Sequence, residues 1–193
     1  MTNTFHATLF AALSLAAGAA RAGAEPADIT PLTYDASVSD LAPAVLATTC
    51  PINIVQISDQ RFSKESIGAE FPIPTSAPEP WIDSGLDRLK SYGFTVQHSV
   101  QPVQDALNLN VRLIRAYTWY GQMRINGVVA FDIDVAGASG QHTEKFRALG
   151  SKTNMWNSKD EHVTALNYAF NHTMHKVAQA LQAECMQAKL AIH

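Results

Sequence analysis

The sequence predicts an α+β fold in which one largely antiparallel β-sheet is covered on one face by two helices. Two consecutive runs between residues 109 and 135 alternate apolar and polar side chains, which is typical of a hairpin with one buried and one solvated face. Segments 81–92 and 160–188 carry apolar residues at three- and four-residue spacing, the pattern of amphipathic helices. Because two strands are not stable alone in water, we expect these helices to cover the apolar face.

The other elements follow from shorter patterns and give the order β-α-β-β-β-β-α. Gly93 ends the first helix, and Ser158 with Glu161 three residues later fits a capping box at the start of the last one. Four prolines predict a long surface loop over 63–80. The fifth strand has a weak alternation and several charges, which favours a sheet edge. The expected strands are 52–57, 94–100, 109–119, 125–135 and 142–152.

Within the hairpin, one phase of the alternation predicts the buried face. Leu109, Val111 and Leu113 share this phase, and the same odd-numbered phase continues through Tyr117 and Trp119. We therefore expect the two aromatic side chains on the same face as the three aliphatic ones.

Composition sets the class of protein. The chain has 193 residues, 47% hydrophobic and 16% charged, which predicts a single globular domain, assigned to residues 51–193. The net charge of -3 argues against a sequence-independent nucleic-acid binder, since such proteins concentrate Lys and Arg on one face. We therefore expect no nucleic-acid partner.

The N-terminus has the pattern of a secretory signal peptide over residues 1–24. The apolar run 9–17 is too short to span a bilayer, and small-x-small triplets follow it at 20–22 and 22–24. The alternative is an ordinary buried N-terminal helix. Residues 25–50 have no clean period and are expected to form an extended lead-in, and no later run is long enough for a transmembrane helix in the mature chain.

The two cysteines, Cys50 and Cys185, predict a disulfide in an exported chain. The bond would join the start of the first strand to the end of the last helix and close a loop of more than a hundred residues. The alternative is two separate buried thiols. A catalytic thiol is not favoured, because Cys185 belongs to the apolar stripe of the helix and no Cys-x-x-Cys motif exists.

Five charged residues form the candidate binding surface. Arg112, Asp132 and Asp134 fall on the polar side of the hairpin, and Asp59 and Arg61 follow the first strand. A core does not require charges on a solvated sheet face, which favours a role in binding. The alternatives are a solubilising surface for the sheet aspartates and turn hydrogen bonds for the charges after the strand.

Histidines are the other candidates for chemistry. His98 lies on the apolar side of strand 94–100, and with the sheet aspartates it supports an alternative hypothesis of general acid–base catalysis. The last helix carries His162, His172 and His175, of which two share a face, but zinc takes three or four ligands. The chain also lacks a Gly-rich phosphate loop, a Gly-x-Ser-x-Gly elbow and a zincin motif. We therefore predict no catalytic, cofactor-binding or metal-binding residue.

The order of these patterns resembles the YajG family of bacterial envelope lipoproteins over residues 50–185. The resemblance rests on Asp59-Gln60-Arg61, Leu109-x-Val111-x-Leu113 with aromatics after it, Phe131-Asp132-Ile133-Asp134, the Gly137–Gly140 turn and an Ala- and Leu-rich closing helix. Family members carry a lipidated cysteine after the signal, which this chain lacks. The resemblance implies an envelope protein with no established activity and no catalytic residues, here in a soluble periplasmic form.

Two functions follow as hypotheses. The first is an exported, non-catalytic protein of the periplasm or cell envelope. One form of this hypothesis associates the protein with the outer membrane. It would bind a protein, peptidoglycan or lipid through the polar face of the sheet and the Pro-rich loop. The alternative is a periplasmic hydrolase with a site near His98 and the sheet aspartates.

Overall fold

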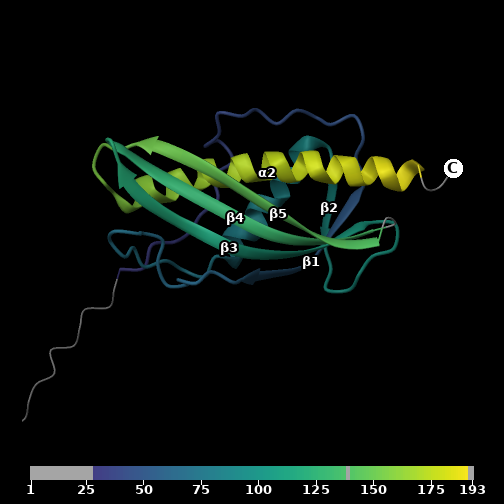
Figure 1. Ribbon diagram of the computed structural model, residues 1–193, viewed down its shortest axis with the longest axis horizontal. Coiled ribbons are helices and arrows are strands. Elements are labelled where there is room, and N and C mark those ends of the chain that lie inside the picture. The colour runs from purple at the N-terminus through teal and green to yellow at the C-terminus, as the bar shows by residue number, and fades with distance from the viewer. Residues whose placement is uncertain (1–27, 138–139, 191–193) are drawn as a thin grey trace, which may run out of the picture.

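The computed structural model describes residues 28–137 and 140–190, which form a five-stranded sheet crossed by one long helix (Figure 1). The predicted signal peptide, residues 1–24, lies outside the described residues. The predicted order of elements and the α+β fold class are confirmed. The elements are β1 (Pro51–Asp59), α1 (Glu79–Leu86), the 3-10 helix η1 (Asp87–Tyr92), β2 (Thr95–His98), β3 (Leu107–Gly121), β4 (Arg124–Gly137), β5 (Gly140–Thr153) and α2 (Lys159–Leu190).

The strands lie in the order β2-β1-β3-β4-β5, so the sheet is mixed and mostly antiparallel. β1 runs parallel to both β2 and β3, and the helices α1 and η1 provide the crossover that joins β1 to its parallel neighbour β2. A two-residue turn, Gln122–Met123, joins β3 to β4 with positive φ at both positions, in keeping with a type I′ hairpin. β5 is an edge strand, as its weak alternation predicts.

One feature of β3 differs from the prediction. The register of β3 against β4 shifts between Leu113 and Arg115, so the side-chain phase changes there. Beyond the shift Ala116 and Thr118 are buried under α2, whereas Tyr117 and Trp119 lie on the outer face of the sheet, half-buried. The expectation that both aromatic side chains belong to the buried face was therefore wrong, because a bulge reverses the alternation.

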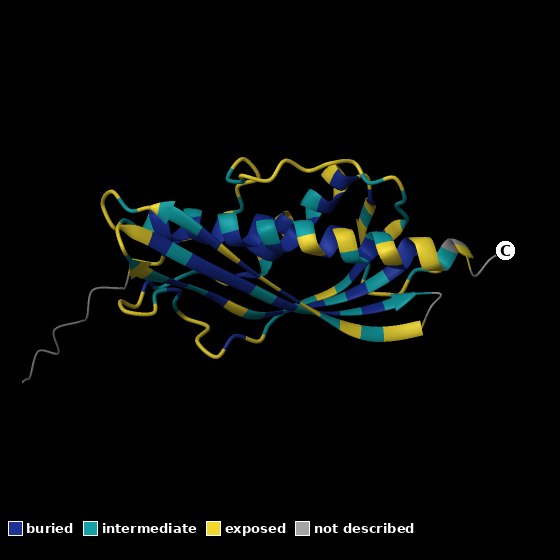
Figure 2. Cartoon of the chain, turned by 45° about the horizontal axis from the view of Figure 1, so that its top comes forward, coloured by how far each residue is buried: buried dark blue, intermediate teal, exposed yellow. Residues whose placement is uncertain are grey.

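The core lies between the sheet and α2. Buried positions run along the helix and the central strands (Figure 2), and the predicted stripe of α2 from Val163 to Cys185 is buried. Phe170 is fully buried, with ring centroids 5.3 Å from Phe131 of β4, 4.6 Å from Trp81 of α1 and 5.4 Å from Tyr34 of the lead-in. This side chain therefore joins the sheet, both helices and the lead-in in one aromatic cluster.

Two glycines in the sheet bring α2 close to the strands. A Cβ at Gly127 of β4 would lie 2.7 Å from the Ala165 carbonyl oxygen, and one at Gly150 of β5 would lie 2.2 Å from the Ala169 backbone nitrogen. The two glycines are paired across the strands. Because any side chain there would overlap the helix backbone, the pair fixes where α2 crosses the sheet.

The lead-in is fastened to the outer side of α2 by two buried amides. Asn167 accepts a hydrogen bond from Trp81 Nε1 (2.9 Å) and donates to the Thr33 carbonyl (2.9 Å). Asn171 accepts from the Tyr34 hydroxyl (2.5 Å) and donates to backbone carbonyls of the lead-in. These bonds satisfy polar groups inside the core and hold residues 33–38 along the helix.

The Pro-rich loop lies only partly at the surface. Ile67 and Ile73 are buried, at 0% and 8% exposed, although the prolines predict a surface loop. Thr118 of β3 donates its backbone N–H to the Ile67 carbonyl (2.6 Å) and accepts one from Ala69 (2.8 Å). β1 ends at Asp59, so this segment occupies the edge of β3 that β1 leaves open.

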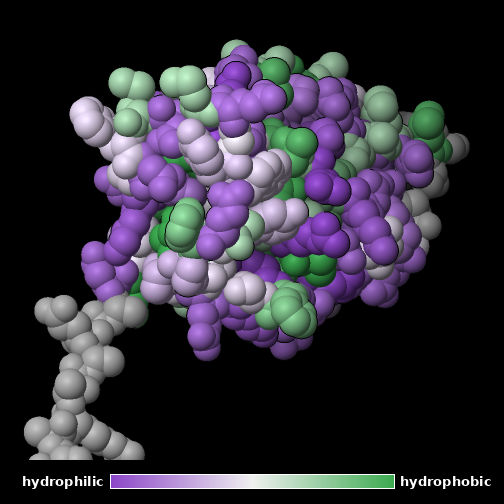
Figure 3. Space-filling model, turned by 60° about the vertical axis from the view of Figure 1, so that its left-hand side comes forward, coloured by the Kyte–Doolittle hydropathy of each residue, from purple (hydrophilic) through white to green (hydrophobic). Residues whose placement is uncertain are grey.

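The end of the molecule at the β3–β4 turn carries exposed apolar side chains. Met123, Met155 and Trp156 are 71%, 66% and 84% exposed. Figure 3 looks onto this end and shows apolar atoms scattered between hydrophilic ones. None of the helices in the described part of the chain is long and apolar enough to cross a bilayer.

Candidate functional site

The outer face of the sheet carries the predicted charges of β3 and β4. Arg112 forms a two-pronged ion pair with Asp134, with 2.9 Å between Nη2 and Oδ1, and Thr143 of β5 donates a hydrogen bond of 2.6 Å to the same carboxylate. These bonds lower the pKa of Asp134 below its ordinary value, chiefly through the guanidinium. Asp132 lies directly opposite Arg112 in the register. The three predicted residues are therefore neighbours on the outer face of the sheet.

This charged cluster lies beside a shallow polar pocket and an aromatic pair. The pocket, of about 210 Å³, is lined by Arg112, Asp134 and the polar side chains of Gln56, Ser58, Gln60 and Asn110. Farther along the outer face the rings of Tyr117 and Trp119 are 5.7 Å apart. The outer face thus combines charge, amides and aromatic side chains.

Asp59 and Arg61, the other two predicted residues, form a buried pair. Arg61 is 3% exposed, and its Nε and Nη2 each lie 2.9 Å from a carboxylate oxygen of Asp59. The guanidinium also donates to the Lys64 carbonyl (2.8 Å), and Asp59 accepts the Arg61 backbone N–H (3.0 Å). This geometry anchors the start of the Pro-rich loop to the end of β1.

His98 is separated from the sheet aspartates. Its Nδ1 lies 3.0 Å from Asp83 and its Nε2 lies 3.4 Å from Asp87, both carboxylates of the α1–η1 segment. β1 and β3 intervene between β2 and β4, a distance of about 14 Å at the usual strand spacing. The side chain is exposed to solvent, although its phase in the strand predicts an apolar side, because β2 is a short edge strand. His98, the Asp59–Arg61 pair and the sheet aspartates do not converge.

The histidines of α2 each have a local partner. His162 is buried, with Nδ1 2.6 Å from the Thr118 hydroxyl and Nε2 3.1 Å from Asn157. Burial lowers the pKa of His162, so the neutral form is favoured in the fold. His172 contacts Asp40 of the lead-in and the Leu149 carbonyl. These contacts connect α2 to its surroundings and do not form a shared site.

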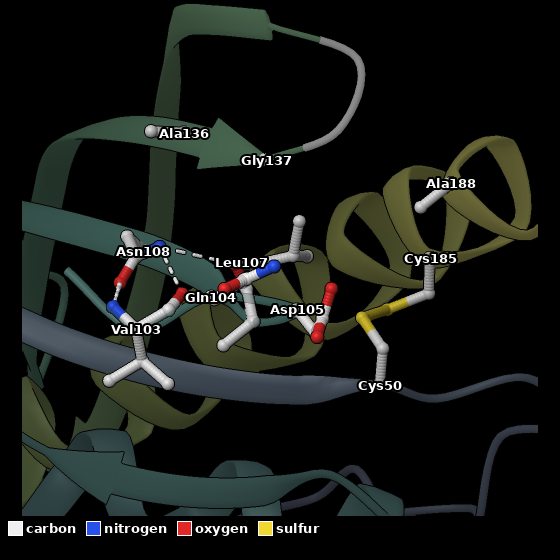
Figure 4. Close-up of a pocket in the computed structure, with 11 residues that line it drawn as sticks. Cys50, Val103, Gln104, Asp105, Leu107, Asn108, Ala136, Gly137, Cys185 and Ala188 are labelled. Atoms are coloured by element: carbon white, nitrogen blue, oxygen red, sulfur yellow. Dashed lines mark hydrogen bonds between the residues drawn. A yellow bond between two sulfur atoms is a disulfide. The ribbon is translucent and has the colours of Figure 1, made fainter. Parts of the chain in front are cut away.

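An apolar pocket lies at the opposite end of the molecule from the β3–β4 turn (Figure 4). Its volume is about 440 Å³, within the range of small-molecule sites. The walls come from the start of β3, the end of β4, the loop before β3 and the last turns of α2. The lining includes Val103, Ala106, Leu107, Ala136, Gly137, Ala188 and the disulfide.

Two features brace this pocket. The predicted disulfide is present, and it joins Cys50 before β1 to Cys185 of α2 with a Cα–Cα distance of 5.6 Å. Asn108 accepts hydrogen bonds from the Val103 backbone N–H (2.7 Å) and from Asn53 Nδ2 (2.9 Å), and donates to the Val103 carbonyl (2.9 Å). Figure 4 shows the bonds between Asn108 and Val103, which hold the loop that forms one wall.

The sequence contains no local signal for the pocket. Its walls come from four separate segments, and most of the side chains are small and apolar, as in an ordinary core. The charged residue of the lining is Asp105, an exposed residue in the left-handed region (φ 62°), whose carboxylate Figure 4 shows between Leu107 and the disulfide. Among the described residues, one further group, His142, Glu144 and Glu184, has the spacing of metal ligands.

Comparisons with known proteins concern the fold. No family model matches the chain, and a search of the curated proteins finds no match either. A solved structure of an uncharacterised protein is 13% identical with a TM-score of 0.48, covering 77% of this chain and 99% of that one. A Xanthomonas campestris protein from a family of unknown function is 13% identical (TM-score 0.44; 83% and 94% covered), and rare lipoprotein B from Shewanella oneidensis is 10% identical (TM-score 0.36; 71% and 98%). The resemblance to the YajG family stays a prediction.

Proposed function

We propose that this protein is an exported, non-catalytic protein of the bacterial cell envelope that binds an apolar envelope molecule in the pocket beside the disulfide. The observation that carries the proposal is the pocket itself, with its apolar lining and its two braces. A cavity held open by a disulfide and by the Asn108 hydrogen bonds is preorganised, so a ligand does not have to order it.

The distribution of titratable groups supports binding over catalysis. General acid–base chemistry needs groups that meet within hydrogen-bond reach of one substrate position. His98 lies beside Asp83 and Asp87, the charges after β1 pair with each other, and Asp134 pairs with Arg112 on the outer face. Each of these titratable groups therefore interacts with a partner of its own, and the pairs lie in separate parts of the structure.

The pocket lining indicates the chemistry of the ligand. Aliphatic and small side chains supply most of the surface, which suits an acyl chain. The Asp105 carboxylate at the rim disfavours an anionic head and suits a neutral or cationic one. We therefore expect a single lipid chain with a head group that carries no net negative charge.

The test uses N-phenyl-1-naphthylamine, a neutral apolar fluorophore, as the probe, and dodecanol and dodecanoate as competitors below their aggregation concentrations. The disulfide-bonded mature chain should enhance the fluorescence saturably, and dodecanol should displace the probe at several-fold lower concentration than dodecanoate. Ala188→Trp fills the pocket and should abolish the enhancement. Ala183→Trp places the same side chain at an exposed position of the same helix and should leave it unchanged.

A second readout concerns the rim. Asp105→Asn should remove the preference for dodecanol while the probe still binds, because the repulsion of the dodecanoate head is lost. Equal fluorescence enhancement by the wild-type chain and by the correctly folded Ala188→Trp variant would show that the probe binds elsewhere, and the proposal would fail.

A second candidate is the docking of a partner protein on the outer face of the sheet and the Pro-rich loop. The specific observation in its favour is the Tyr117–Trp119 pair next to the Arg112–Asp134 ion pair. Tyr, Trp and Arg are the residues enriched in the centres of protein interfaces. Substitutions on this face test partner docking separately from ligand binding, because the polar pocket on this face and the apolar pocket have no lining residue in common.

A further inference from the structure

Three potential metal ligands meet where the start of β5 packs on the last turns of α2. His142 and Glu144 are two residues apart, so their side chains lie on the same side of β5, in phase with the buried Phe146. Glu184 of α2 faces them and is 8% exposed. One ligand atom from each of the three lies within 4.8 Å of the others.

The spacing of these atoms fits a shared cation. His142 Nε2 lies 3.5 Å from Glu144 Oε1 and 3.6 Å from Glu184 Oε1. Good N–H···O hydrogen bonds are shorter, at about 2.7–3.2 Å. Two ligand atoms on a tetrahedral zinc ion, each about 2.0–2.2 Å from the metal, are about 3.4 Å apart. The two distances from His142 Nε2 are thus close to those that tetrahedral coordination requires, and the two carboxylate oxygens are no more than 4.8 Å apart.

The charges of the three side chains also suit a bound cation. Two carboxylates are held within 4.8 Å of each other, and one of them is nine-tenths buried. A divalent cation matches the charge of two carboxylates, and a neutral imidazole supplies the third ligand without adding charge.

A second cluster of similar composition has a different geometry. At His98, Asp83 lies beside Nδ1 and Asp87 beside Nε2, so the two carboxylates are on opposite nitrogens of the ring. A single ion cannot contact both nitrogens and both carboxylates. At His142, by contrast, the same Nε2 faces both glutamates. The His98 cluster is therefore a matched control for an effect of composition alone.

We propose that His142, Glu144 and Glu184 form a site for Zn²⁺. Imidazole and carboxylate ligands in a tetrahedral arrangement suit zinc, whereas Mg²⁺ and Ca²⁺ prefer six or more oxygen ligands. The side chains of His142 and Glu144 are 38% and 33% exposed, so water can reach the fourth position. The ion holds the start of the edge strand against α2, next to the end of the molecule that carries the apolar pocket. The site does not depend on the proposed function.

The experiment is a calorimetric titration of the mature, disulfide-bonded chain with zinc chloride after removal of metal with EDTA. We expect one equivalent of Zn²⁺ to bind, with a rise in Tm, and no binding heat from Mg²⁺ under the same conditions. His142→Ala and Glu184→Gln should each weaken the affinity at least tenfold, and His98→Ala should leave it unchanged.

The metal-free variants are first compared with the wild-type chain by circular dichroism, so that lost binding is not lost folding. His142→Ala removes a partly exposed side chain from an edge strand and is the variant on which the test depends if Glu184→Gln is unstable. The proposal is overturned if the wild-type chain binds no stoichiometric zinc, or if His142→Ala binds it as tightly as the wild type.

Discussion

Gly85 of α1 lies in direct contact with the ring of Phe170 in α2. A Cβ at Gly85 would lie 1.7 Å from Phe170 Cε1 and 2.2 Å from Cζ. Both residues are buried, and the ring also contacts Trp81 and Phe131. The Phe170 ring therefore occupies the space that a side chain at position 85 would need. The helix α1 can approach α2 this closely only with glycine at that position.

The first prediction is that Gly85→Ala destabilises the fold, although alanine is a better helix former than glycine. The added methyl group overlaps a ring that is packed on all sides, and overpacking of this kind costs about 1–3 kcal/mol or more. Urea denaturation of the mature chain measures the change. The double variant Gly85→Ala/Phe170→Leu should be less destabilised than the sum of the single variants, because leucine gives up the volume that the methyl group needs. Additive effects would contradict the contact.

The second prediction concerns the ring itself. Phe170→Ala should lower the free energy of unfolding by about 3–5 kcal/mol, since it leaves a cavity where the sheet, α1 and the lead-in meet. The variant should behave as a folding mutant. Lys176→Ala, an exposed position of the same helix, should change the stability by no more than about 0.5 kcal/mol.

Periodicity predicted the elements because each has one buried face. The stripe on α2 and the alternation in the hairpin encode that face residue by residue. No residue pattern marks the bulge after Leu113, and the prediction for Tyr117 and Trp119 is wrong for that reason. The Gly85–Phe170 contact, in the same way, depends on two elements whose relative placement no local pattern specifies.

The candidate site was less predictable than the fold. Arg112, Asp132 and Asp134 were found together because they share one hairpin, where register follows from the alternation. The burial of Arg61 depends on where the following loop returns, which the sequence near it does not indicate. The apolar pocket and the His142 cluster are assembled from distant segments, and only the tertiary structure brings them together.

A third prediction is that the disulfide contributes strongly to stability. The bond closes a loop with a sequence separation of 135 residues, for which the chain-entropy estimate is about 4–5 kcal/mol. The double variant Cys50→Ser/Cys185→Ser should therefore lose a few kcal/mol in oxidising buffer. Under a reductant it should match the wild-type chain, and a large difference that persists there would assign the effect to packing.

The fourth prediction is a loss of stability in mild acid that depends on His162. Burial lowers the pKa of this histidine in the folded chain, outweighing the opposite influence of Glu161 and Glu70. The unfolded chain, with an ordinary pKa of about 6.5, therefore binds more protons below that pH. The contribution of His162 to the stability of the fold is complete above about pH 6.5. It is lost as the pH falls toward the pKa of this side chain in the folded chain. Thermal unfolding at pH 7.5 and 5.5 should show a smaller difference for His162→Gln than for the wild type.

The fifth prediction is that the chain is exported and cleaved after Ala22 or Ala24. The reason is the apolar run 9–17 followed by two small-x-small triplets. Intact-mass measurement of protein from a periplasmic extract should give a chain that begins at Gly23 or Glu25. Full-length protein with Met1 in a cytoplasmic fraction would contradict export.

The last prediction separates the outer face of the sheet from the fold. A triple variant that combines Arg112→Gln, Asp132→Asn and Asp134→Asn should have a Tm within a few degrees of the wild type. The three side chains are partly exposed, and ion pairs at the surface contribute little to stability. If a partner docks on this face, its recovery from envelope extracts should fall with the triple variant and with replacement of the loop segment 71–80. The apolar fluorophore should still bind both variants, since the pocket lies on other residues. Undiminished recovery with both variants would exclude the outer face and direct attention to the polar side of α2, where His172 and His175 lie.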